Sequence, residues 1–172
     1  MPTIGVAIAL PEPWATQLQD YRASLGDETA GSIPTHITLV PPVELSEDQV
    51  GAVEGHLLAA AATSDSFLIH LRGTGTFRPV SPVVFVSLVQ GISQCEALAE
   101  RVRQGPLAVP LQFPFHPHVT IAHHRPEDVM DRAFAELASF DCIFGVERFH
   151  LYRHDDENGW RPVRDFAFRA AQ

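Results

Sequence analysis

The chain has 172 residues and is 45% hydrophobic, enough to bury the core of one domain or of two closely packed lobes. Twelve arginines and no lysine stand against 21 acidic residues, so the net charge is −9 with neutral histidines. A protein that clamps long duplex DNA or RNA needs a basic stripe to neutralise phosphates, and this chain disfavours that class. An acidic protein still tolerates a small anionic ligand in a local pocket.

The sequence has no feature of an exported or membrane protein. Cys95 and Cys142 lack metal-ligand spacing and are too few for a disulfide framework, which fits a reducing cytoplasm. Residues 1–10 are apolar but lack a basic leader. The longest apolar run, residues 83–89, is far shorter than the roughly 20 residues that span a bilayer. We expect a monomeric cytoplasmic protein with no membrane segment.

The first half of the chain alternates predicted strands and helices. Proline, glycine and capping residues bound the elements, and Pro41-Pro42 is expected to end the second strand. Ser46 and Gln49 form a capping box, and a helical stripe follows it. The predicted elements are a strand over 3–10, a helix between Pro13 and Gly26, a strand over 36–40, a helix from Ser46 to about Ala61, and a strand over 67–71.

The second half repeats this order. A Ser93/Glu96 capping box is expected to open its first helix, and Met130, Ala133, Phe134 and Leu137 are expected to face inward from its second. The predicted elements are a strand over 83–89, a helix from Ser93 to Gly105, a strand over 118–122, a helix from Pro126, and strands around 142–152 and 160–168.

Each half therefore reads strand, helix, strand, helix, strand, with one His-x-Thr motif in its second strand. His36-Ile37-Thr38 and His118-Val119-Thr120 lie about 80 residues apart, too far for a solenoid repeat but suited to half of a two-lobed domain. Residues two apart in a strand point the same way, so each His-Thr pair shares one face and the apolar residues share the other. If a pseudo-twofold axis relates the lobes, both pairs converge on one cleft.

The segments 34–39 and 116–121, Pro-Thr-His-Ile-Thr-Leu and His-Pro-His-Val-Thr-Ile, resemble the two His-x-Thr signatures of the 2H phosphoesterases. The bacterial 2′-5′ RNA ligase or RNA 2′,3′-cyclic phosphodiesterase branch is the most similar. The resemblance implies an α+β bilobal duplicated fold, with antiparallel sheets forming a central cleft and helices outside. Residues 1–172 would form one domain with lobes at about 1–80 and 81–172, with possible strand exchange between them.

The same resemblance implies hydrolysis of a small cyclic phosphodiester or an RNA terminus, without metal or cofactor, and possible 2′-5′ ligation. His36 would give a proton to the leaving oxygen, and His118 would activate water. Imidazoles with an unperturbed pKa of about 6.5 suit both roles near neutral pH. The hydroxyls of Thr38 and Thr120 would donate hydrogen bonds to the non-bridging oxygens.

Further substrate contacts are expected from the segment 73–79 and from the residues after the second motif. Phe77 and Arg78 follow a glycine-rich stretch that is similar to a family segment near the cleft. Many relatives carry an arginine where this chain has His123, so His123 is the candidate phosphate contact here. Many relatives also carry an aromatic residue shortly after the first motif, where this chain has Pro41 and Pro42.

Two other function classes stay open. His116, His118, His123 and His124 are close enough in sequence to suggest a hydrolase with a zinc or iron site, although no obvious carboxylate ligand lies among them. Alternatively, the duplicated domain binds an RNA end or a phosphorylated ligand without turning it over.

Overall fold

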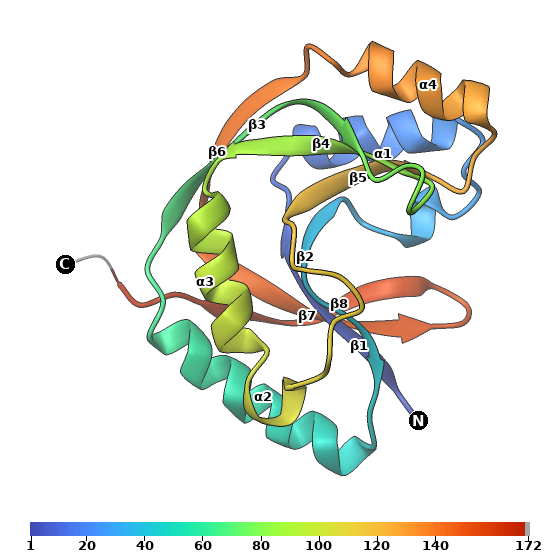
Figure 1. The fold of residues 1–172 in the computed structure, drawn as a ribbon. Coiled ribbons are helices and arrows are strands. Elements are labelled where there is room, and N and C mark those ends of the chain that lie inside the picture. The colour runs from blue at the N-terminus through green and yellow to red at the C-terminus, as the bar shows by residue number, and fades with distance from the viewer. Residues whose placement is uncertain (171–172) are drawn as a thin grey trace.

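The computed structural model describes residues 1–170, which form two four-stranded antiparallel sheets and four α-helices (Figure 1). In chain order the elements are β1 (Thr3–Ala9), α1 (Trp14–Ser24), a 3-10 turn (Ala30–Ser32), β2 (His36–Glu44), α2 (Glu47–Ala62), β3 (Phe67–Thr76), β4 (Val83–Gln90), α3 (Ile92–Val102), a 3-10 turn (Gly105–Leu107), β5 (His118–His123), α4 (Glu127–Glu136), β6 (Asp141–Val146), β7 (Arg148–Asp155) and β8 (Gly159–Ala167). The fold is α+β with antiparallel sheets, as expected.

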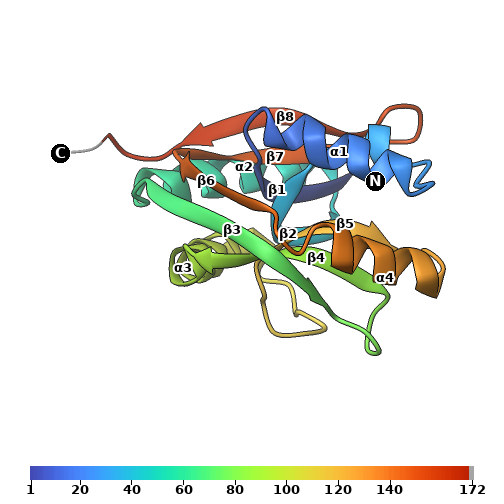
Figure 2. The ribbon, with the colours of Figure 1, turned by 90° about the horizontal axis from the view of Figure 1, so that it is seen from above.

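Each His-x-Thr motif lies on the edge strand of a different sheet. The strand orders are β2-β1-β7-β8 and β5-β4-β3-β6, so β3 pairs with strands of the second half and β7 and β8 return to the first sheet. The two sheets form separate layers (Figure 2). The edge strands β2 and β5 contact each other in the middle of the molecule (Figure 1). The two motifs therefore meet where the sheets adjoin.

The side chains of both motif strands alternate between the core and the junction of the sheets. Ile37 and Leu39 are fully buried, and Val119 and Ile121 occupy the same positions in β5. The intervening His and Thr residues of both strands are only partly buried. This is the period-two pattern that the sequence predicts, and it directs both imidazoles away from the core.

Two helices each pack against the motif strand of the other half of the chain. Helix α1, which precedes the first motif strand, packs against β5, and α3, which precedes the second, packs against β2. Helices α2 and α3 contact each other, while α4 covers strands of the second sheet (Figure 1). Helix α1 therefore brings residues of the first half beside the second motif.

The expectation that Pro41-Pro42 ends the second strand is wrong, because β2 continues to Glu44. The register changes from Ile4 opposite Val43 to Val6 opposite Val40, so β2 carries one extra residue at the two prolines. Prolines lack a donor for the sheet ladder and are tolerated on an edge strand or at such a bulge. Both prolines are exposed, as this position requires.

Of the two predicted capping boxes, only the first is observed. The hydroxyl of Ser46 accepts from the backbone of Gln49, whose side chain in turn accepts from the backbone N–H of Ser46. Helix α3 instead begins after Gly91, which has φ 93° and whose added Cβ would lie 2.6 Å from the carbonyl oxygen of Leu68. The left-handed turn at this glycine starts the helix before Ser93.

Phe134 was expected to face the core, but its side chain is 39% exposed. Met130 and Ala133 are the buried residues of α4, and Phe134 lies at the edge of that narrow stripe. A short, ten-residue helix on the outside of a sheet needs only a narrow apolar face.

No helix among residues 1–170 combines the length and apolar character needed to cross a bilayer.

Candidate active site

Both motif histidines are held by the same local hydrogen bond. Nδ1 of His36 lies 2.6 Å from the carbonyl oxygen of Pro34, and Nδ1 of His118 lies 2.6 Å from that of His116. A carbonyl only accepts, so Nδ1 of each ring carries the hydrogen. Nε2 of each ring has no hydrogen-bond partner among residues 1–170. Each imidazole is therefore oriented with a free nitrogen that can exchange a proton.

The surroundings of His36 favour its neutral form. Burial lowers the pKa of His36, and the positive charge of Arg22 lowers it further, while the hydrogen bond to the carbonyl of Pro34 raises it. The net pKa lies below the ordinary value of 6.5. In the free protein near neutral pH, His36 is therefore predominantly uncharged.

His118 is enclosed by aromatic rings. The ring centroids of Phe77 and Phe85 lie 4.9 Å and 5.3 Å from that of His118. Burial lowers the pKa of His118, the hydrogen bond to the backbone of His116 raises it, and His116 and His36 lower it when they are protonated. Because β2 and β5 contact each other, the protonation of one motif histidine disfavours that of the other.

A cavity of about 260 Å³ spans the junction between the two sheets. Its walls include His36 from β2, Thr120 and His123 from β5, and Arg22 from α1. A base or acid, a hydroxyl donor and a cation thus face one volume. This combination suits an anionic ligand that undergoes proton transfer.

A second cavity, of about 90 Å³, also has His36 in its wall. Thr38 lines it together with apolar residues of β1 and the rings of Tyr152 and Trp160. Burial raises the pKa of Tyr152 to about 12, so its hydroxyl stays protonated. His36 therefore lines both a polar cavity and an aromatic one.

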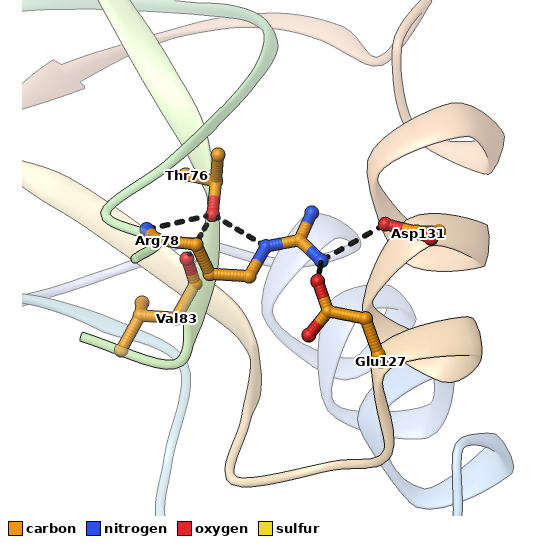
Figure 3. Close-up of polar contacts among 5 residues, drawn as sticks. All are labelled: Thr76, Arg78, Val83, Glu127 and Asp131. Atoms are coloured by element: carbon orange, nitrogen blue, oxygen red, sulfur yellow. Dashed lines mark hydrogen bonds and ion pairs between the residues drawn. The ribbon is translucent and has the colours of Figure 1, made fainter. Parts of the chain in front are cut away.

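Of the two candidate residues in the segment 73–79, Phe77 lies beside His118, whereas Arg78 forms ion pairs with α4. The guanidinium of Arg78 pairs with Glu127 and Asp131 of α4, at 2.9 Å each, and its Nε donates to the hydroxyl of Thr76 (Figure 3). Arg78 lines neither of the two cavities. It joins the β3–β4 loop to α4, whereas the ring of Phe77 forms part of the wall around His118.

His123 lines the larger cavity beside a buried acid. Its Nε2 lies 3.5 Å from Oδ2 of Asp27, whose side chain is 9% exposed. Burial raises the pKa of Asp27, but hydrogen bonds from Thr29 and the charges of His123 and Arg22 outweigh it, and the net pKa is lowered. The charged carboxylate of Asp27 therefore restrains His123 at the cavity wall.

Several residues of the site were not predicted from the sequence: Arg22, Asp27, Phe85, Tyr152 and Trp160. Only Arg22 left a local signal. Leu18 and Arg22 of α1 and Leu25, which caps its C-terminus, are all buried, so a charged residue interrupts an apolar stripe at helical spacing. The other four come from segments whose positions depend on the tertiary fold.

The histidine cluster does not form a metal-binding group. In the part of the chain that the structure describes, no three His, Cys, Asp or Glu side chains are arranged to hold an ion. The rings of His116 and His118 are 6.0 Å apart, and those of His123 and His124 are 5.6 Å apart. The arrangement of these four side chains therefore gives the metal-hydrolase hypothesis no support.

Comparison with known proteins gives consistent results. A family model described as the 2′-5′ RNA ligase superfamily matches residues 10–158. A Bacillus licheniformis protein that bears the name phosphoesterase is 27% identical over 159 residues, or 90% of this chain and 94% of that protein. A Geobacillus kaustophilus protein with the same name is 28% identical over 164 residues, or 94% of each chain.

Solved structures agree on the fold. E. coli LigT, crystallised with 3′-AMP, matches with a TM-score of 0.71 at 23% identity, over 99% of this chain and all of LigT. A Thermus thermophilus protein matches with the same TM-score at 22% identity, over the full length of both chains. The family match, covering most of the chain, shows what the histidine motifs suggested. The chain belongs to the 2′-5′ RNA ligase superfamily of 2H phosphoesterases, which are enzymes of phosphoesterase or RNA-ligase type.

Proposed function

We propose that this protein hydrolyses a 2′,3′-cyclic phosphate, on a nucleotide or at an RNA end, to a 2′-phosphomonoester without a metal ion. The observation that carries the proposal is the pair of matched histidines on adjoining edge strands, each with Nδ1 bonded to a carbonyl and Nε2 free. In-line displacement at phosphorus needs a base for water and an acid for the leaving oxygen. One histidine from each sheet meets this need.

In the proposed reaction, Nε2 of His118 takes a proton from water while the water oxygen forms a bond to phosphorus. The bond between phosphorus and the 3′ oxygen breaks, and Nε2–H of protonated His36 gives that oxygen its proton. The step leaves His118 protonated and His36 neutral, and proton exchange with solvent restores the pair. The hydroxyls of Thr38 and Thr120 donate to the non-bridging oxygens as negative charge develops.

The two cavities support a nucleotide as the substrate class. The larger one presents Arg22, Thr120 and His123 to a phosphate, and the smaller one offers the rings of Tyr152 and Trp160 to a nucleobase. E. coli LigT has been crystallised with 3′-AMP, ATP and NADP⁺, all nucleotides. We infer that the phosphate of a cyclic nucleotide lies beside His36, which lines both cavities, and that its base lies toward Tyr152 and Trp160.

The experiment that tests the proposal compares His36→Ala and His118→Ala with the wild type on nucleoside 2′,3′-cyclic phosphates, with and without a chelator. We expect turnover to resist the chelator and to fall by roughly 10²-fold or more in each variant. His70→Gln, which alters a histidine paired with Asp141 outside the site, is the matched control. Full activity in either alanine variant contradicts the mechanism. Tight binding by the wild type with no product after long incubation would instead support the non-catalytic binding module.

Ligation would use the same displacement with a different nucleophile. A 5′-hydroxyl in place of water would attack the cyclic phosphate, with the two histidines keeping their roles, and would leave a 2′-5′ linkage. We expect hydrolysis to dominate because water is present at far higher concentration. Incubating a cyclic-phosphate RNA end with excess 5′-hydroxyl oligonucleotide, and resolving the products by length, measures the ratio.

A further inference from the structure

Arg22 is a buried arginine on the wall of the catalytic cavity. Arg22 is only 3% exposed, and it lies on the core-facing side of α1 between Leu18 and the C-cap residue Leu25. Its Nη2 donates to the carbonyl oxygen of Ile33, which precedes the first motif. Its Nε is buried and has no hydrogen-bond partner among residues 1–170. The protein thus keeps an incompletely satisfied cation inside the fold.

A buried guanidinium is costly unless a counter-charge offsets its lost hydration. The acid that acts on it is Asp27, but that carboxylate accepts two hydrogen bonds from Thr29 and lies 3.5 Å from His123. No ion pair joins Asp27 or any other carboxylate of the described chain to Arg22. A purely structural arginine at this depth is normally paired. The cation therefore has capacity for a ligand.

The position of Arg22 identifies that ligand. Helix α1 packs against β5, so the guanidinium faces the same cavity as His36, Thr120 and His123. An anion bound there would touch a catalytic histidine and a hydroxyl donor at the same time. The planar guanidinium fork matches the geometry of phosphate oxygens.

We propose that Arg22 is a substrate-binding residue, whose guanidinium binds a non-bridging oxygen of the phosphoester between His36 and Thr120. This inference rests on the proposed function and adds the residue that neutralises the substrate. Arg22 also couples substrate binding to proton transfer by His36. The charge of Arg22 lowers the pKa of His36 in the free protein, and a bound phosphate offsets that charge, so binding favours the protonated His36 that must act as acid.

Binding of inorganic phosphate tests the inference without relying on turnover. By isothermal titration calorimetry, we expect Arg22→Met to weaken phosphate affinity about ten- to a hundred-fold, because it removes a charge-assisted contact. Arg22→Lys keeps the charge but loses the fork, and its affinity should lie between the two. Arg103→Met is the control, since Arg103 is half-buried and, like Arg22, donates to a backbone carbonyl, that of Ala99, away from the cavity. It should bind phosphate like the wild type.

Two NMR measurements separate binding from a structural role. In the wild type, phosphate should shift the Nε–H resonance of Arg22, which needs no variant and so survives a folding defect in Arg22→Met. The pKa of His36, followed by its ring resonances, should rise in Arg22→Met and not in Arg103→Met. An unshifted Arg22 resonance, or phosphate affinity unchanged in Arg22→Met, overturns the inference. Loss of turnover in the histidine variants is a separate result, so failure of the proposed reaction is distinguishable from failure of the anion site.

Discussion

The two motif strands, β2 and β5, carry the same His-x-Thr motif and the same histidine-to-carbonyl hydrogen bond, yet their histidines have different neighbours. His36 lines two cavities and is acted on by the charge of Arg22, whereas His118 lies beside the rings of Phe77 and Phe85. Both histidines have a lowered pKa. Burial and the charge of Arg22 lower the pKa of His36, whereas burial and the neighbouring histidines lower that of His118. Identical motifs therefore become chemically distinct, as an acid and a base must be.

The largest expected effect separates the two histidines by role. His36→Ala and His118→Ala should each lose roughly 10²- to 10⁴-fold in turnover of a cyclic phosphate. With a phosphodiester whose leaving group is p-nitrophenolate, which departs without a proton, His36→Ala should recover most of its activity and His118→Ala should not. Steady-state kinetics on both substrates give the comparison. Recovery in His118→Ala instead would reverse the assignment of acid and base.

Gly75→Ala should disturb the β5 side of the site alone. A Cβ on Gly75 would lie 2.6 Å from the ring of Phe85, which packs against His118. We expect a loss of about 1–3 kcal/mol in the free energy of unfolding from overpacking. Displacement of the His118 wall should also reduce kcat/KM by about tenfold or more. Gly145→Ala, a strand position with open space around it, is the control for denaturant unfolding and kinetics. Equal effects at both glycines would contradict the proposed wall.

The lowered pKa values of His36 and His118 predict the pH dependence of activity. The kcat/KM profile should be bell-shaped and centred below pH 6.5, the ordinary histidine value from which both groups are lowered. A profile centred at or above that pH would contradict both shifts.

The lowered pKa values of His36 and His118 also predict how the free energy of unfolding depends on pH. The unfolded chain binds more protons than the folded one between the lowered and the ordinary pKa, so unfolding free energy falls as pH drops through 6.5. Thermal unfolding between pH 7 and pH 5 should therefore be less pH-dependent in the His36→Gln/His118→Gln double variant than in the wild type. An unchanged slope would mean that neither imidazole is more easily protonated in the unfolded chain.

The smallest expected effect comes from Phe77→Leu. The edge-to-face contact of Phe77 with His118 has a typical value of about 0.5–1.5 kcal/mol, so we expect a few-fold loss in kcat/KM. A smaller side chain also admits water, which should raise the pKa of His118 toward its ordinary value while that of His36 stays unchanged, by NMR titration. Phe113→Leu, at a site that is 54% exposed, is the control. A shift at both histidines would show that their surroundings are not independent.

Residues whose roles follow from local pattern were predictable. The buried Ile37 and Leu39 opposite His36 and Thr38 follow from the two-residue period of a strand, and the Ser46 cap follows from helix-end chemistry. Prediction failed where a distant contact overrides a local preference. Gly91 starts α3 because the backbone of Leu68 lies against it, and β2 runs through Pro41 because it is a sheet edge.

The sequence by itself determined the repeated order of elements and the two His-x-Thr strands, because periodicity and capping act over a few residues, and the resemblance of these motifs to the 2H phosphoesterases implied the α+β class. Only the tertiary structure decided what surrounds each histidine. Arg22 reaches the larger cavity because α1 packs against β5, about 100 residues later in the chain, and Trp160 reaches the smaller one because β7 and β8 return to the first sheet. The interrupted apolar stripe of α1 marks Arg22 but does not show which cavity it lines, and Trp160 has no local signal, since burial and charge at the site depend on the packing of segments distant in sequence.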